Sequence, residues 1–129
     1  MVDANSNPYT SKEAWTRTLL QALNGPDSDV EPTFLKLYTR DTTITLDGKS
    51  YTLESFLTHV MQLRSIAVDF ELNSHCFLRD GNLFAEKHTL AGTMREGGAR
   101  VEVEGYIFGE IDESGKAGWV DEQTRTLEA

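Results

Sequence analysis

The spacing of apolar residues divides the chain into a helical first half and a second half of strands. Apolar side chains recur at helical intervals over residues 15–23, and a Gly-Pro pair then ends the helix. A capping box over residues 10–13 is expected to begin it. A short second helix is predicted around residues 32–38, and a third over residues 53–64, with Thr52 as its N-cap.

Beyond residue 65 the period of the apolar residues changes from about 3.6 to about 2, which indicates strands. Turn sequences such as Asp80-Gly81 and Gly97-Gly98 separate long alternating runs. Four long antiparallel strands are therefore expected, and in so short a chain they must twist and bend strongly. With a short strand before the third helix, the predicted strands cover residues 42–46, 68–79, 84–94, 101–111 and 116–127.

Length and charge narrow the class of protein. A chain of 129 residues fits one α+β domain, expected over residues 10–129 after a loose polar segment at 1–9. A net charge of −9 argues against nucleic-acid binding and against an anionic membrane surface. The polar start and the lack of a long apolar run favour the cytoplasm. Cys76 is the one cysteine in the sequence and is expected to be a small buried apolar residue.

The order of these elements, together with three short motifs, resembles the nuclear-transport-factor-2-like superfamily in its SnoaL-like branch. The motifs are LYTRDTTI at residues 37–44, LFAEKHTLAGT at 83–93 and GKAGW at 115–119, and the match covers roughly residues 11–128. The resemblance implies a cone, in which a strongly bent antiparallel sheet packs on three N-terminal helices and encloses a pocket. It also implies a homodimer formed through the outer face of the sheet.

Members of this superfamily include ketosteroid isomerase, scytalone dehydratase and polyketide cyclases, as well as non-enzymatic proteins. The resemblance therefore implies a cofactor-free isomerase, cyclase or dehydratase. Such an enzyme would act on a small hydrophobic molecule of natural-product biosynthesis by general acid–base catalysis. Two alternatives stay open: a non-catalytic domain that binds a small apolar ligand, and a dimerisation or protein-interaction domain.

Catalytic residues of such a pocket are expected to be ionisable groups on inward strand faces, where burial moves a pKa toward neutrality. His88 and Glu86 alternate with apolar residues on one strand and could form an acid–base couple, or equally a structural ion pair. His75 lies on the preceding strand, at a position where relatives carry a histidine, although strict alternation places it on the face opposite Phe70 and Leu72 unless a bulge intervenes. On the last strand the candidate is Asp121 or Glu122, and alternation does not choose between the two faces.

Four further residues are candidates for substrate binding: Tyr38, Asp41, Tyr106 and Trp119. The two tyrosines could donate a hydrogen bond to a substrate oxygen, although a buried tyrosine is commonly a core residue. One departure from the relatives concerns Leu46, which occupies about the position of the catalytic base of ketosteroid isomerase. Three scattered histidines lack the spacing of a zinc site, so no metal is expected, and His59 is expected at the surface.

Overall fold

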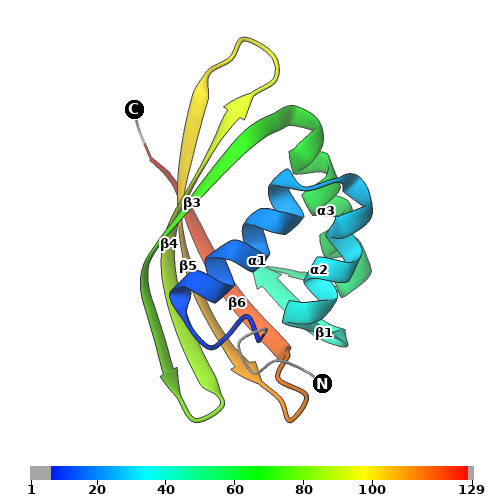
Figure 1. The fold of residues 1–129 in the computed structure, drawn as a ribbon, viewed down its shortest axis with the longest axis vertical. Coiled ribbons are helices and arrows are strands. Elements are labelled where there is room, and N and C mark those ends of the chain that lie inside the picture. Colours follow the sequence, from blue (N-terminus) through cyan, green and yellow to red (C-terminus); the bar gives the residue numbers. More distant parts are fainter. Residues whose placement is uncertain (1–6, 128–129) are drawn as a thin grey trace.

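The structure, a computed structural model, describes residues 7–127. Over these residues the chain forms three α-helices, one 3-10 turn and a six-stranded sheet (Figure 1). The helices are α1 (Lys12–Asn24), α2 (Val30–Leu37) and α3 (Leu53–Ile66), with the 3-10 turn η2 (Asp27–Asp29) before α2. The strands are β1 (Tyr38–Leu46), β2 (Lys49–Tyr51), β3 (Ala67–Asp80), β4 (Leu83–Met94), β5 (Arg100–Ile111) and β6 (Ala117–Leu127).

The helix starts follow local capping chemistry. Thr52 caps α3 as predicted: its hydroxyl accepts a hydrogen bond from the backbone N–H of Ser55, whose own hydroxyl accepts from the N–H of Thr52. The predicted capping box at the start of α1 is wrong by one residue. Ser11 is the N-cap and its hydroxyl accepts from the backbone N–H of Ala14 at 3.0 Å, which satisfies a donor that the helix leaves free.

The strands form one sheet in the order β2-β1-β6-β5-β4-β3. The four long strands pair antiparallel, as predicted. β1 lies parallel to β6, so the sheet is mixed, and β1 also pairs antiparallel with the short β2, which the sequence analysis did not predict. β1 begins at Tyr38, four residues before the predicted start. The parallel pairing of β1 with β6 joins the first strand of the chain to the last one described.

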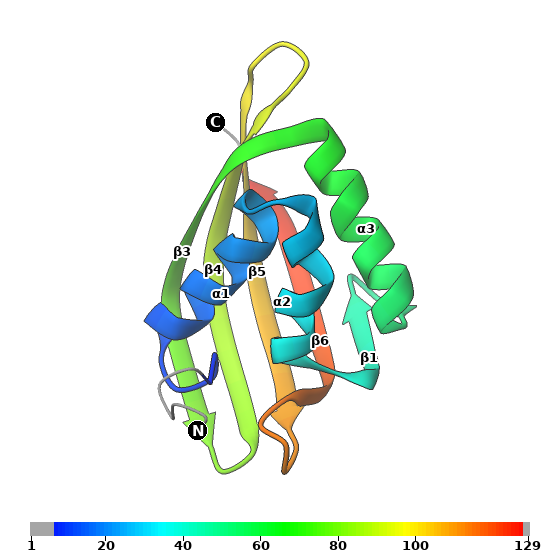
Figure 2. The ribbon, with the colours of Figure 1, turned by 45° about the vertical axis from the view of Figure 1, so that its right-hand side comes forward.

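All three helices lie on the concave side of the sheet, which curls around them without closing (Figures 1 and 2). This is the α+β cone that the sequence predicted, and its core lies between the helices and the inner face of the sheet. The side chain of Asn24 fastens α1 to β3: its amide donates to the carbonyl of Phe70 at 2.8 Å and its oxygen accepts from the N–H of Phe70 at 3.0 Å. These two hydrogen bonds hold the end of α1 against β3, beside the core.

Two residues lie differently from expectation. Tyr9, in the segment expected to be loose, is 1% exposed and donates a hydrogen bond to the carbonyl of Leu37 at 2.7 Å, while residues 1–6 lie outside the described part of the chain. Cys76 is exposed, so the prediction of a buried thiol is wrong. A bulge in β3 between Ser74 and Cys76 reverses the alternation and turns Cys76 outward. Within residues 7–127, no helix combines the length and apolarity needed to cross a membrane.

Candidate active site

A partly enclosed cavity of about 360 Å³ lies inside the cone, between the helices and the inner face of the sheet. Small-molecule pockets commonly have volumes of about 300–1,000 Å³. Most of the lining is aliphatic and aromatic, and the polar side chains among it are few. The described lining residues are Trp15, Leu19, Leu23, Phe34, Tyr38, Leu46, Asp47, Phe56, His59, Val60, Leu63, His88, Leu90, Val103, Ile107, Glu122 and Thr124.

A buried pair of ionisable side chains lies beside this cavity: His88 lines it, and Glu86 contacts His88. Glu86 and His88 are 3% and 4% exposed, on the inward face of β4 that the alternation predicted. The Nδ1 atom of His88 lies 2.6 Å from Oε1 of Glu86. The hydroxyl of Ser74, on the neighbouring strand β3, donates to the other oxygen of the Glu86 carboxylate at 2.8 Å. Glu86 is thus held on both oxygens and fixes the orientation of the imidazole.

Glu122 approaches the same imidazole from β6. Its Oε2 atom lies 3.6 Å from Nε2 of His88, and its side chain is 19% exposed. Within residues 7–127 its carboxylate makes no hydrogen bond. Burial raises the pKa of Glu122 to about 7; the positive charge of His88 opposes this shift, and the negative charges of Glu86 and Asp47 add to it. Glu122 can therefore take up or release a proton near neutral pH.

The pKa of His88 is also displaced. Burial by itself lowers the pKa of His88, but the hydrogen bond to Glu86 and the negative charges of Glu86 and Glu122 outweigh burial, so the net shift is upward. The imidazole is consequently protonated over a wider pH range than a free histidine. It then provides the positive charge that both carboxylates face.

The absence of a side chain at position 105 makes this arrangement possible. Gly105, on β5, pairs with His88 in the sheet and separates it from β6. A Cβ atom at this position would lie 2.5 Å from Nε2 of His88 and 3.1 Å from Oε2 of Glu122. Gly105 therefore leaves the space in which the imidazole crosses β5 to meet the carboxylate.

Tyr38 adds a phenolic hydroxyl to the same cavity. The residue is 8% exposed and stacks on the ring of Phe34 at 5.9 Å between centroids. Burial, with the negative charges of Glu122 and Glu86, raises the pKa of Tyr38, so the hydroxyl keeps its proton. It makes no hydrogen bond to any residue in the described range 7–127. Tyr38 can therefore donate to a molecule in the cavity.

The other predicted site residues lie away from the cavity. Tyr106, Trp119 and Asp121 are exposed and line a depression on the outer face of the sheet. His75 is the bulged residue of β3; it is exposed and its Nε2 lies 2.8 Å from the hydroxyl of Thr89. Asp41 is exposed on β1. Of the residues predicted for the site, the structure brings together His88, Glu86, Glu122 and Tyr38.

Three polar residues near the site were missed by the sequence analysis. His59 was predicted at the surface, but it is half-buried and lines the cavity together with its neighbours Phe56 and Val60 on α3. Asp47 also lines the mouth; it has a positive φ of 51° in the turn after β1, and its carboxylate accepts from the backbone N–H of Thr124 at 2.7 Å. Ser74 supports Glu86. The available signal was that Ser74, two residues after Leu72, shares the apolar face of β3.

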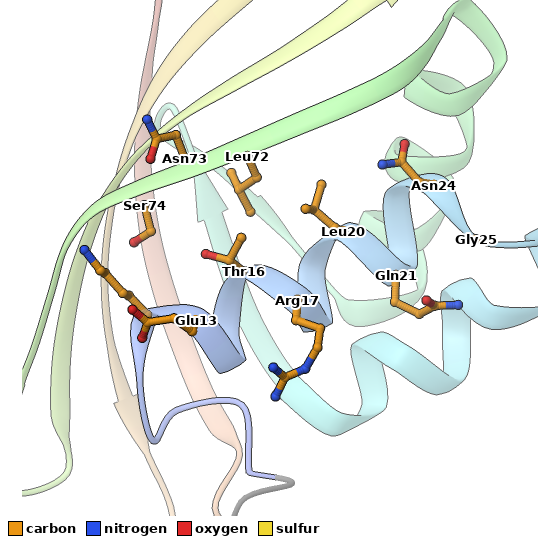
Figure 3. A pocket seen from close by; sticks show the side chains of 11 residues that line it. Glu13, Thr16, Arg17, Leu20, Gln21, Asn24, Gly25, Leu72, Asn73 and Ser74 are labelled. Carbon is orange, nitrogen blue, oxygen red and sulfur yellow. The ribbon is translucent and has the colours of Figure 1, made fainter.

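A separate groove lies outside the cavity, between α1 and β3 (Figure 3). It is larger, about 710 Å³, and Thr16 and Leu20 of α1 face Leu72 and Ser74 of β3 across it. Charged and amide side chains of α1 flank it. Ser74 connects the groove to the interior through its hydrogen bond to Glu86. The groove itself holds no buried ionisable group among the described residues, so we take the inner cavity as the candidate site.

Comparison with solved structures shows the fold of the nuclear-transport-factor-2-like superfamily. A proposed isomerase from Rhodopseudomonas palustris superposes with a TM-score of 0.70 at 13% identity, covering 91% of this chain and 92% of its own. IdmH, a proposed polyketide cyclase from Streptomyces antibioticus, gives 0.66 at 16% identity, covering 85% and 89%. An NTF2-like protein of unknown function from Exiguobacterium gives 0.65 at 12% identity, covering 87% and 99%. No protein-family model matches the sequence, and no curated protein does.

Proposed function

We propose that the chain is a cofactor-independent enzyme that isomerises, cyclises or dehydrates a small hydrophobic molecule by general acid–base catalysis. The observation that carries the proposal is the contact of Glu122 with the Glu86–His88 pair at the wall of an apolar cavity. Ionisable groups that titrate near the working pH and lie in an apolar cavity are typical of enzymes that use general acid–base catalysis. The fold is shared with a proposed isomerase and a proposed cyclase.

Each polar group has a distinct role in this proposal. The carboxylate of Glu122 removes a proton from a carbon next to a carbonyl group; the C–H electron pair forms a C=C bond, and the carbonyl electrons move to oxygen. The Tyr38 hydroxyl donates to the resulting enolate oxygen. Where a C=C bond adjoins that carbon, protonated Glu122 returns the proton to the far end of this C=C bond. The enolate C=C electrons then form a C=C bond one position along and the oxygen electrons restore the carbonyl group, which completes an isomerisation. His88, held by Glu86, orients Glu122 and keeps the pKa of its carboxyl from rising further.

A probe reaction tests the proton-transfer step without knowledge of the natural substrate. The apolar compound 5-nitrobenzisoxazole loses one C–H proton to a base, its N–O bond breaks, and a coloured phenolate forms. We expect the chain to accelerate this opening with a rate that rises through pH 7 as Glu122 ionises. Glu122→Gln should lower the rate at least about tenfold, since a positioned base contributes about 100-fold or more.

The matching histidine variants separate His88 from an exposed histidine. His88→Gln removes the positive charge that lowers the pKa of Glu122, so the pH–rate profile should move to higher pH. His75→Gln, at the outer bulge, should leave the profile unchanged. Equal rates in the wild type and in Glu122→Gln would contradict the enzyme proposal. If the probe still bound competitively with other apolar molecules, that result would favour a non-catalytic ligand-binding domain.

We also propose that the chain forms a homodimer through the outer face of the sheet. Large apolar side chains are exposed there: Leu78 is 61% exposed, Phe108 48%, Tyr106 45% and Trp119 37%. The rings of Phe108 and Trp119 lie 5.9 Å apart, and the ammonium group of Lys87 lies 5.3 Å from the ring centre of Tyr106. Contiguous exposed apolar patches commonly mark interfaces. We further propose a cytoplasmic location and a role in natural-product biosynthesis, as the sequence predicts.

A further inference from the structure

The ionisable groups that line the cavity, together with Glu86 behind His88, carry more negative than positive charge. Two carboxylates, Glu86 and Glu122, share the one imidazole of His88, at 2.6 and 3.6 Å. A third carboxylate, that of Asp47, lines the mouth. Among the described residues that line the cavity, none is a lysine or an arginine. When Glu122 is ionised, one carboxylate beside His88 therefore lacks a full counter-charge.

The same space is surrounded by aromatic rings. Trp15, Phe34, Tyr38 and Phe56 all line the cavity. The Phe34 and Phe56 rings meet edge to face at 5.5 Å, and the Trp15 ring lies 5.4 Å from the imidazole of His88. Aromatic faces attract cations that lie within about 6 Å of the ring centre. The buried Tyr38 hydroxyl, without a partner in residues 7–127, is a further polar group left for a ligand.

We propose that this cavity selects a hydrophobic amine, placing the ammonium group at Glu122 and the apolar body against the aromatic rings, in preference to a neutral or anionic molecule of the same shape. The proposal rests on the proposed function, because it assigns a charge to the molecule that the same cavity binds. An ammonium group near Glu122 supplies the missing positive charge. An anion would add a third negative group beside two carboxylates in a poorly solvated space, which is unfavourable.

Proton release should accompany the binding of the amine. The charged and titratable groups near Glu122 are His88 and Glu86 from β4, Tyr38 from β1 and Asp47 from the turn after β1, with His59 of α3 on the same cavity. At neutral pH, part of the Glu122 population holds a proton, and the ammonium ion must displace that proton. The affinity for the amine should therefore rise with pH across the range in which Glu122 ionises.

Three probes of one skeleton test the proposal on the full chain by titration calorimetry: cyclohexylmethylamine, cyclohexylmethanol and cyclohexanecarboxylate. At pH 8 we expect the amine to bind at least about tenfold more tightly than the alcohol. The reason is that a hydrogen bond between charged groups contributes more to binding than one between neutral groups. The carboxylate should bind most weakly. At pH 6 the ratio of amine to alcohol affinity should fall, and the heats in two buffers of different ionisation enthalpy should reveal proton release.

Variants on one strand provide the control. Glu122→Gln keeps the shape of the side chain and should remove the preference for the amine while retaining the affinity for the alcohol. Asp121→Asn removes a charge one residue away on the outer face and should retain the preference. A wild-type chain that binds the amine no more tightly than the alcohol at pH 8, or a preference that survives Glu122→Gln, overturns the proposal. The pH dependence of the wild type decides the matter even if Glu122→Gln does not fold.

The outcomes separate this proposal from the proposed function. If the alcohol binds without a preference for the amine, and the benzisoxazole reaction still depends on Glu122, the amine proposal fails and the catalytic one stands. If the preference for the amine is found but that reaction proceeds equally well in Glu122→Gln, the catalytic proposal fails and the amine proposal stands. If none of the three probes binds, the amine proposal fails as well.

Discussion

At the scale of single residues, the site depends on which face of a strand each polar side chain occupies. Glu86 and His88 were predictable because apolar residues share their face of β4. Glu122 was not separable from Asp121, because Trp119 and Val120 give each face of β6 one apolar residue next to the pair, so alternation does not show which face is inward. Alternation with Phe70 and Leu72 places His75 on the opposite face of β3, where it is exposed, whereas the bulge that turns Cys76 outward depends on pairing with β4 and not on local sequence.

Glu122 should make the stability of the chain depend on pH. Its pKa is about 7 in the folded chain against 4.5 ordinarily, so the folded state binds the proton more tightly than the unfolded state does. The free energy of unfolding of the wild type should then fall as pH rises from 5 to 9. The raised pKa of His88 acts in the same direction. For Glu122 we expect a loss of about 1–3 kcal/mol, discounted for its partial exposure.

Urea unfolding at pH 5, 7 and 9 measures this dependence. Glu122→Gln should flatten the curve and be the more stable chain at pH 9. Asp121→Asn serves as the control and should follow the wild type. A Glu122→Gln curve that runs parallel to the wild-type curve would show that Glu122 titrates normally.

Gly105→Ala should displace His88. The new methyl group would meet Nε2 of His88 at 2.5 Å, whereas a Cβ at Gly118 of β6 would have nothing within 4 Å. We expect Gly105→Ala to cost about 1–3 kcal/mol of stability through overpacking. It should also change the His88 titration followed by NMR. Gly118→Ala should leave that titration as it is, and an unshifted His88 titration in Gly105→Ala would contradict the crossing of the imidazole over β5.

At the scale of elements, the long periodic segments were predictable and the short or non-local ones were not. The helices α1 and α3 and the strands β3 to β6 follow from apolar spacing and turn sequences. β2 has three residues, too few to show a period. The parallel pairing of β1 with β6 joins segments about 75 residues apart, as in Thr43 with Trp119. The local spacing of apolar residues does not indicate which distant strand pairs with β1.

The joint between α1 and β3 gives a prediction at this scale. Asn24→Ala removes both hydrogen bonds to the backbone of Phe70, whose side chain is 5% exposed. Leaving that N–H and carbonyl without partners should cost about 1–3 kcal/mol. Chemical denaturation measures the loss, and Asn73→Ala, at an exposed position of β3, is the control that should cost far less. An equal effect of the two variants would mean that water replaces Asn24 at no cost.

At the scale of the whole molecule, the inner and outer faces of the sheet have different chemistry. The inner face holds buried ionisable groups in an apolar cavity, whereas the outer face exposes aromatic rings. This division follows from alternation, because neighbouring residues such as Asp121 and Glu122 point to opposite faces. The candidate site and the surface proposed for a second copy therefore lie on opposite faces of one sheet.

Phe108→Glu should weaken the proposed dimer. A charge in the centre of an apolar interface is costly, so we expect the dimer dissociation constant to rise at least about tenfold. Sedimentation velocity over a range of concentrations measures it. Met61→Glu places the same charge on α3, at a residue 36% exposed and away from the outer sheet face, and should leave association unchanged. A wild-type chain that remains monomeric at high concentration would remove the basis for the proposal.

The parallel contact of β1 with β6 also has a consequence for the order of folding. β6 lies between β1 and β5, yet it is the last strand in chain order. During synthesis, one edge of β1 and one edge of β5 therefore stay unpaired until β6 has left the ribosome. Such long-range pairing slows folding. Glu122 lies on that same strand, so the candidate site is assembled only in the step that completes the sheet.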